Sequence, residues 1–355
     1  MTENADDTLK DIRFINYCIS LELWKSDISM KKYINYFSEK TCLGLNQVEI
    51  YSKTVLCPKI FKLTHSAIDT LKNQQKFKSL IFADDFIDNN SLFTMLPEHI
   101  EYITLQGTSN MVFDQEEVLD LTNLPRELIY LDIGYKFKYL LTLDYLPTGL
   151  KVLRMGSKLD VPINNLPQGL EILEIGSAFN HSIDNLPDSI RILIFKTKSR
   201  DWYIYKSKPF NIYINKINKL PLGLEILILE DVLDSVICNI DFSYLDNLTY
   251  LALPHNFDDV KFFEPEIIKW SPNLKKLHIG KIYNQIINVL PSCLEVLIVH
   301  QNFNLEDNLV SVPSSLKNVM IDVRNEYIYN DKCNYETFKK LEDKFPGLKI
   351  KFLSK

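Results

Sequence analysis

The sequence contains no apolar run of the ~18 residues that would cross a bilayer as a helix, although 46% of its 355 residues are hydrophobic. It also opens without a secretory signal, because "MTENADDTLKDIRF" is acidic and polar. A net charge of −6 argues against general nucleic-acid binding. These absences predict an intracellular, cytoplasmic protein with no membrane segment and a sizeable core.

The sequence also lacks the patterns of catalytic and metal sites. Its six cysteines form no CxxC pair and no cluster with zinc-ligand spacing, so we expect them to be buried small apolar residues in a reducing compartment. The motifs GxxxxGK[ST], GxGxxG, HExxH and GxSxG are absent, and the six histidines are scattered. The sequence therefore predicts no cofactor, no metal centre and no enzyme.

What the chain does contain is an internal repeat. If Leu170 is position zero, apolar residues follow at offsets 3, 5, 9 and 13, a polar Asn180 at offset 10, and Leu186-Pro187 close the unit. Units that begin at Leu150 and Leu274 share every offset. Prolines 147, 167 and 187 are 20 residues apart (167 − 147 and 187 − 167), which matches the lower end of leucine-rich repeats, ~20–29 residues.

Each part of the repeat has a physical meaning. The motif "LxxLxL" predicts a short strand with inward-pointing side chains, and the residue at offset 9 is expected to fill the centre of a coil. The Asn or Asp at offset 10 can bond main-chain groups in the turn and bridge adjacent coils. Leu-Pro then predicts an extended return path, because proline disfavours helix at the preceding residue.

The segment "GSAFNHSIDNLP", residues 176–187, resembles the FNIP-type leucine-rich repeats of social amoebae and giant DNA viruses, and "GKIYNQIINVLP" and "GSKLDVPINNLP" are near matches. The resemblance extends over roughly residues 100 to 325. It implies a mostly β, α/β repeat fold: a leucine-rich-repeat-like solenoid of short parallel strands with irregular or extended return segments, which binds other proteins. In viral relatives an F-box that recruits a ubiquitin ligase often precedes the repeats, but residues 1–45 contain no recognisable F-box.

The ends of a solenoid need caps, because open ends expose apolar surface and strand edges. We expect an N-terminal capping region at 1–45, with a small recruiting domain as the alternative, then the solenoid at 46–325 and a C-terminal cap at 326–355. In that cap "NYETFKKLEDKF" (334–345) has helical spacing, and "LKIKFLSK" is a candidate last strand.

One repeat carries an insertion at 196–209, "KTKSRDWYIYKSKP", in which Trp202 and Tyr203 lie among basic residues. Basic residues with aromatics can bind single-stranded nucleic acid, or they can form a protein-binding edge. The third interpretation is a solvated hairpin with its aromatic side chains packed on the solenoid.

The strand residues between the inward leucines should face outward on the sheet. Several are aliphatic, and we predict a partner-binding patch there; Trp202 and Tyr203 of the insertion are also predicted to bind the partner. The predicted partner-binding residues are Val152, Ile172, Ile192, Ile194, Ile226, Ile228, Val296, Ile298, Trp202 and Tyr203. The alternatives are that the insertion folds over this patch, or that isoleucine merely favours strands.

The sequence thus predicts a non-enzymatic protein–protein interaction scaffold that binds a protein partner or a second copy of itself. The alternatives are the substrate-recognition subunit of a ubiquitin ligase and a structural component of a viral particle. For a viral protein, the expected location is the host cytoplasm or the virion.

Overall fold

The computed structural model of the chain contains two compact units, Met1–Gly156 together with Lys355, and Ser157–Ser354. The structure describes residues 49–51, 54–57, 72–73, 79–82, 95–105, 118–119, 121–133, 140–156, 159–176, 178–195, 217–229, 232, 234–254, 262–280, 283–300, 303–322 and 343–353.

The first unit contains a sheet with the strand order β1-β2-β3-β4-β6-β8. Its strands are β1 (Glu49–Tyr51), β2 (Thr54–Cys57), β3 (Ser79–Phe82), β4 (Tyr102–Leu105), β6 (Tyr130–Ile133) and β8 (Val152–Arg154). The first two pair antiparallel, and the later neighbours pair parallel. Two short strands, β5 (Val118–Leu119) and β7 (Leu140–Leu141), form a separate parallel pair.

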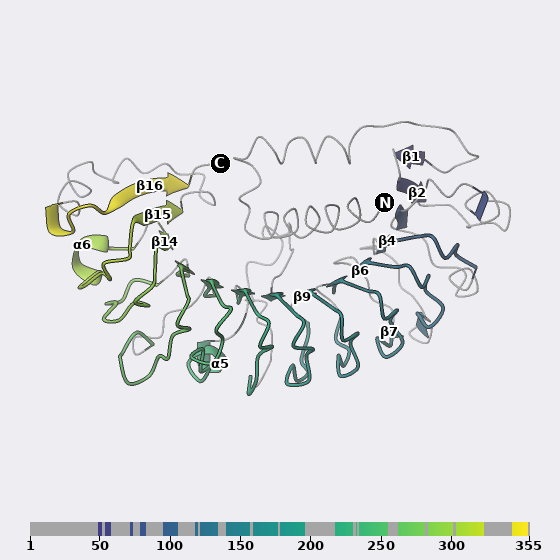
Figure 1. Cartoon of the computed structure of the whole chain (residues 1–355), viewed down its shortest axis with the longest axis horizontal. Coiled ribbons are helices and arrows are strands. Elements are labelled where there is room, and N and C mark those ends of the chain that lie inside the picture. Colours follow the sequence, from purple (N-terminus) through teal and green to yellow (C-terminus); the bar gives the residue numbers. More distant parts are fainter. Residues whose placement is uncertain are drawn as a thin grey trace, which may run out of the picture. The chain divides into compact units, whose positions relative to one another are not determined.

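The second unit contains a parallel sheet with the strand order β9 to β16 in sequence (Figure 1). Its strands are β9 (Ile172–Ile175), β10 (Ile192–Phe195), β11 (Ile226–Ile228), β12 (Tyr250–Ala252), β13 (Lys276–His278), β14 (Val296–His300), β15 (Asn318–Asp322) and β16 (Lys349–Leu353). The described part of the second unit also contains two helices of a single turn each, α5 (Asp234–Ile237) and α6 (Leu305–Asn308). The strands and the described return segments form the coils of a parallel β-solenoid, which is the fold that the repeat predicts.

The pairing register places equivalent repeat positions side by side. The offset-3 residues of the second unit pair with one another from strand to strand. All are fully buried, at 0% exposure: Leu173, Leu193, Leu227, Leu251, Leu277, Leu297 and Val319. Burying one such side chain stabilises the fold by ~1.5–3 kcal/mol, so this row forms the continuous core of the unit.

The residue at offset 9 fills the centre of its coil, as predicted. Phe179 and Tyr283 are among the largest fully buried side chains. The ring centroid of Tyr283 lies 5.2 Å from that of Phe263 and 6.3 Å from that of Phe303. Aromatic contacts therefore link the interiors of successive coils.

A main-chain carbonyl just before each strand holds the next coil in register. The Glu171 carbonyl accepts hydrogen bonds from the N–H groups of Arg191 and Ile192, at 2.9 and 3.1 Å. The Glu225 carbonyl accepts the same pair of bonds from Thr249 and Tyr250. Carbonyls of Glu101, Ile129, Arg191, Thr249, Lys275 and Glu295 are used in the same way. Strand entry is thereby fixed at one position of every repeat.

Polar side chains at offset 10 bridge adjacent coils, which confirms the prediction for this position. The Asp160 carboxylate accepts from the Asn180 N–H at 2.8 Å, and the Asn284 side-chain carbonyl accepts from the Asn304 N–H at 2.9 Å. In several coils a second bridge comes from a polar residue just before the apolar residue at offset zero. Ser189 donates its hydroxyl proton to the Leu170 carbonyl at 2.6 Å. These bonds give main-chain groups of the turns a partner in the neighbouring coil.

The predicted last strand is confirmed, because β16 pairs in parallel with β15 over five residues, Lys349 to Leu353. Gly347 precedes it with a φ of 91°, a left-handed conformation that glycine adopts at least cost. Of the predicted helix at 334–345, the structure describes Asp343 and Lys344, which are helical, and Phe345, which lies in a bend. Residues 1–45 and the insertion at 196–209 lie outside the described residues, so the domain boundaries stay predictions.

A close approach between coils leaves no room for a side chain at Gly223. A Cβ atom there would lie 2.3 Å from the Asp188 carbonyl oxygen, which already accepts a hydrogen bond from the Gly223 N–H. We expect Gly223→Ala to lower the free energy of unfolding by ~1–3 kcal/mol, the usual cost of overpacking. Gly149→Ala is the control, because its added Cβ would lie 3.5 Å from the nearest atom. Urea titration measures both; equal loss in the two variants would contradict the prediction.

Candidate binding surface

The second face of the sheet carries the strand residues that point away from the leucine core. In the second unit, the first row is Ile172, Ile192, Ile226, Tyr250, Lys276, Val296 and Asn318. The other row is Glu174, Ile194, Ile228, Ala252, His278, Ile298 and Met320. The strand register therefore places these predicted partner-binding residues in the two rows, as the sequence indicated: Ile172, Ile192, Ile194, Ile226, Ile228, Val296 and Ile298.

Their exposure, however, was predicted wrongly. Most of the aliphatic side chains on this face are buried in the structure: Val152, Ile172, Ile192, Ile194, Ile228 and Ile298. The prediction assumed that only the leucine face of the sheet is buried. Burial of aliphatic groups stabilises the folded state by ~25 cal/mol per Å² on either face. Strands buried on both faces read as nearly continuous apolar runs, and "ILIF" in β10 is such a run.

Part of the second face remains accessible. Ile226 on β11 is half-buried, and a further set of half-buried side chains lies on three adjacent strands. We call this set the β13–β15 surface; its residues are Lys276, His278, Val296, Asn318 and Met320. The register places Lys276, Val296 and Asn318 in one row. Trp202 and Tyr203 lie outside the described residues, so their predicted role is not placed on any surface.

The β13–β15 surface has a basic border. The Lys276 ammonium lies 5.7 Å from the centroid of the Tyr250 ring, within cation–π range. Lys317 donates to the Glu295 carboxylate at 3.0 Å. This hydrogen bond, and then the charges of Lys317 and Lys275, hold the pKa of Glu295 below its usual value. Glu295 is therefore ionised at neutral pH and is matched by neighbouring cations.

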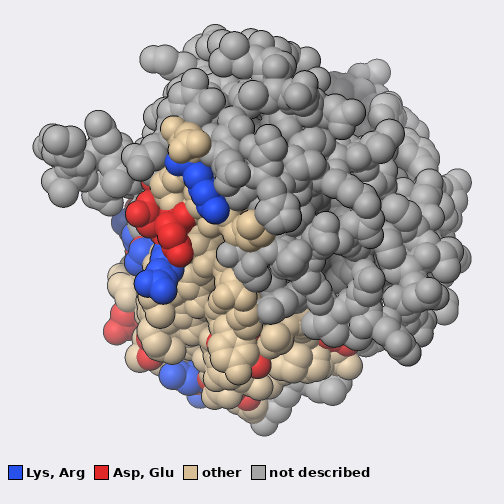
Figure 2. Space-filling model, turned by 90° about the vertical axis from the view of Figure 1, so that its right-hand side faces the viewer, with Lys and Arg blue, Asp and Glu red and all other residues tan. Residues whose placement is uncertain are grey.

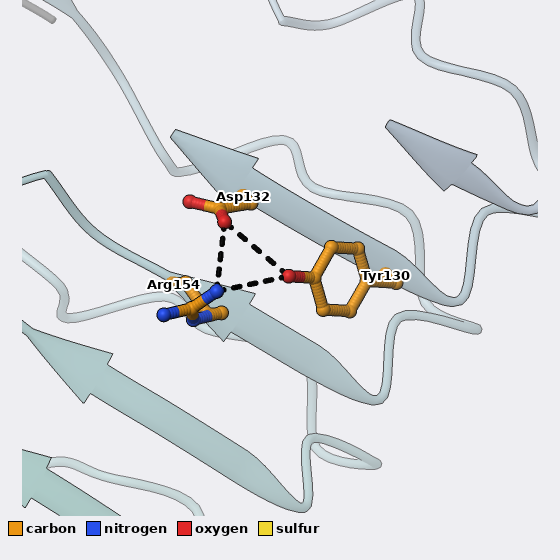
Figure 3. A network of polar contacts seen from close by, with 3 residues as sticks. All are labelled: Tyr130, Asp132 and Arg154. Carbon is orange, nitrogen blue, oxygen red and sulfur yellow. Dashed lines mark hydrogen bonds and ion pairs between the residues drawn. The ribbon is translucent and has the colours of Figure 1, made fainter. Parts of the chain in front are cut away.

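In the first unit, the second face carries a polar network in place of an aliphatic row (Figure 3). Arg154 on β8 donates from Nη1 to the Asp132 carboxylate at 2.9 Å and to the Tyr130 hydroxyl oxygen at 3.2 Å. The Tyr130 hydroxyl donates in turn to Asp132 at 3.3 Å. The Arg154 and Asp132 side chains are only 10% and 20% exposed. The repeat pattern places these residues on this face, but the sequence analysis did not predict their pairing. The feature that could have revealed it is the opposite charge of Asp132 and Arg154 at the same position of adjacent repeats.

Figure 2 shows a different side of the molecule, on which acidic and basic side chains lie next to one another among the described residues. That visible part carries no patch of a single sign, and mixed charges give little long-range attraction for a charged partner.

Among the described residues, no group of three or more His, Cys, Asp or Glu side chains could hold a metal ion. No helix in the described part of the chain is long and apolar enough to span a membrane. Cys238 is half-buried and Cys293 is exposed, and both are free thiols. The expectation of buried cysteines is therefore wrong for Cys293, which lies in the polar turn before a strand, where the chain packs on one side only.

Comparison with known proteins matches one segment to a family model. Residues 161–198, which include β9 and β10, match the FNIP repeat. The chain contains an FNIP repeat. Among curated proteins, none matches the chain.

The fold is similar to that of a solved structure described as CroV588, a novel circular LRR protein, from the giant virus CroV. The TM-score is 0.55 and the sequence identity is 25%, over 79% of this chain and 38% of that chain. The chain thus spans well under half the length of that protein. This similarity supports the fold described above, a parallel solenoid of the leucine-rich-repeat type.

The polar network predicts a specific pattern of stabilities. Arg154→Met should lower the free energy of unfolding by ~2 kcal/mol, because it leaves the Asp132 carboxylate largely buried without its cation. Adding Asp132→Asn should recover most of that loss, since a neutral amide is cheaper to bury than a charge. Chemical denaturation of both variants measures this; a double variant no more stable than Arg154→Met would contradict the assignment.

Proposed function

We propose that the chain is a non-enzymatic scaffold that binds a protein partner through the β13–β15 surface. The observation that carries the proposal is the accessibility of this surface on a sheet face whose other described aliphatic residues are mostly buried. Solenoids are known for extended binding surfaces of this kind, because stacked repeats place side chains in regular rows.

The composition of the surface suits a protein interface. Val296 and Met320 supply apolar contact area, and methionine adapts its shape to a partner. Lys276, His278 and Asn318 supply polar groups around them. An apolar centre with a polar rim is the usual anatomy of a protein interface.

The backbone of the surface is fixed before any partner arrives. The Lys275 carbonyl accepts hydrogen bonds from both Glu295 and Val296, and the Glu295 carbonyl accepts from both Lys317 and Asn318. Little main-chain ordering would therefore accompany binding, which favours affinity. The buried isoleucines of β9 and β10 contribute stability to this platform.

Two further observations support a binding function over catalysis. The described residues contain no cluster suited to a metal ion, and the chain contains a repeat whose architecture presents surfaces more readily than pockets. No contact among the described residues favours the ubiquitin-ligase or the virion alternative.

The proposal is tested by affinity purification from the native cell with mass spectrometry, using the intact chain and a Val296→Asp/Met320→Asp variant. The proteins enriched by the intact chain should be lost by the variant, because each Asp places a charge in the apolar centre. Lys276→Glu, a single charge reversal on the same surface, should weaken the same capture.

The matched control is Ile286→Asp/Val310→Asp, which alters two apolar side chains that are 51% and 54% exposed in the same unit. It should capture the same proteins as the intact chain. Thermal unfolding of every variant checks that the fold is retained. Equal capture by folded surface variants, or no specific capture by the intact chain, would overturn the proposal.

A further inference from the structure

The strand β16 ends the sheet of the second unit. It pairs with β15 on one side, and no described strand pairs with its other edge. In the preceding coils, N–H groups at the equivalent edge donate to the next coil, as from Leu253 to the His278 carbonyl at 2.9 Å. Because main-chain groups alternate between the two edges of a strand, the N–H and C=O groups of Ile350 point to the far edge of β16.

The core side of this last coil is incompletely covered. The inward residues at the same position in the three preceding strands are Leu277, Leu297 and Val319, and all are 0% exposed. Ile350 continues this row but is only half-buried. One more layer of apolar side chains would complete the row.

The opposite face of β16 is basic. Lys349 and Lys351 alternate with Ile350, and both are exposed. The register places Lys349 beside Asn318 and Lys351 beside Met320, so they extend the rows of the β13–β15 surface. Lysines on an edge strand discourage pairing with a like-charged strand, while a strand with carboxylates opposite them is favoured.

We propose that the far edge of β16 binds an extended segment of a partner protein in which acidic and apolar residues alternate. The segment adds to the sheet as a further strand. Its main chain bonds the edge groups of Ile350, its apolar side chains cover Ile350, and its carboxylates lie beside Lys349 and Lys351. The inference rests on the proposed protein-binding function and names the chemistry of one partner segment.

A second copy of the chain is the less suitable occupant. Two β16 edges paired antiparallel would place the lysines of one copy near those of the other, and like charges opposite one another destabilise a strand pair. The charge of this strand therefore selects an acidic occupant.

Fluorescence anisotropy with a labelled peptide of alternating Glu and Val, titrated with the intact chain, tests the proposal. We expect saturable binding that weakens in ~1 M salt, where the screening length falls to ~3 Å. Lys349→Glu/Lys351→Glu should weaken binding at least about tenfold, because attraction becomes repulsion at two positions. The charge-matched control Lys219→Glu/Lys269→Glu, at exposed sites elsewhere in the unit, should bind within about twofold of the intact chain.

Two peptide controls separate strand addition from simple charge attraction. A peptide of alternating Lys and Val should not bind, and a Glu-Val peptide with N-methyl groups along one edge should lose binding, because its main chain can no longer donate. No saturable binding, or binding unaffected by N-methylation or by the charge reversal on β16, would overturn the inference.

The peptide-binding test of the β16 edge and the capture test of the β13–β15 surface can fail independently. Val296→Asp alone should keep peptide binding, since Val296 lies on β14 and β15 separates it from β16. Peptide binding without any captured partner would leave the edge site standing and overturn the β13–β15 proposal. Capture that depends on Val296 and Met320, without peptide binding, would overturn the edge site alone.

Discussion

The structure depends on the in-register stacking of one coil on the next. In most described coils one carbonyl before the strand receives two N–H groups from the following coil, as at Glu171 and Glu225, and this fixes where the next strand begins. With that position set, the offset-3 leucines meet in a fully buried row. A slip of one residue would turn each leucine to the opposite face, so register and core stability are the same constraint.

The same constraint determines what the second face of the sheet can do. Register brings residues of equal offset side by side, so a row is uniform where the repeats agree and changes character where they differ. Isoleucines over β9 and β10 give a buried aliphatic row, whereas Tyr130, Asp132 and Arg154 give a charged network. Over β13–β15 the row becomes mixed and accessible, and this is the part of the sheet for which we propose a binding function.

Much of this architecture was predictable from the sequence. The offsets of Leu173, Phe179 and Asn284 have direct structural causes, namely an inward strand position, a coil centre and a bridging turn, and each of these predictions was confirmed. The burial of Ile172, Ile194 and Ile228 was not predicted, because periodicity shows which face a side chain is on but not what packs against that face. The pairing of Arg154 with Asp132 requires rotamers and distances, and a repeat pattern contains neither.

Hydrogen–deuterium exchange of the second unit tests the central claim most directly. The account predicts that the amides of Arg191, Ile226 and Tyr250, which donate to strand-entry carbonyls of the preceding coil, exchange slowly and are protected to a similar degree, because opening any one of them breaks the stack. Exchange of these amides as fast as that of the exposed turn residues Asn185 and Asn273 would contradict in-register stacking.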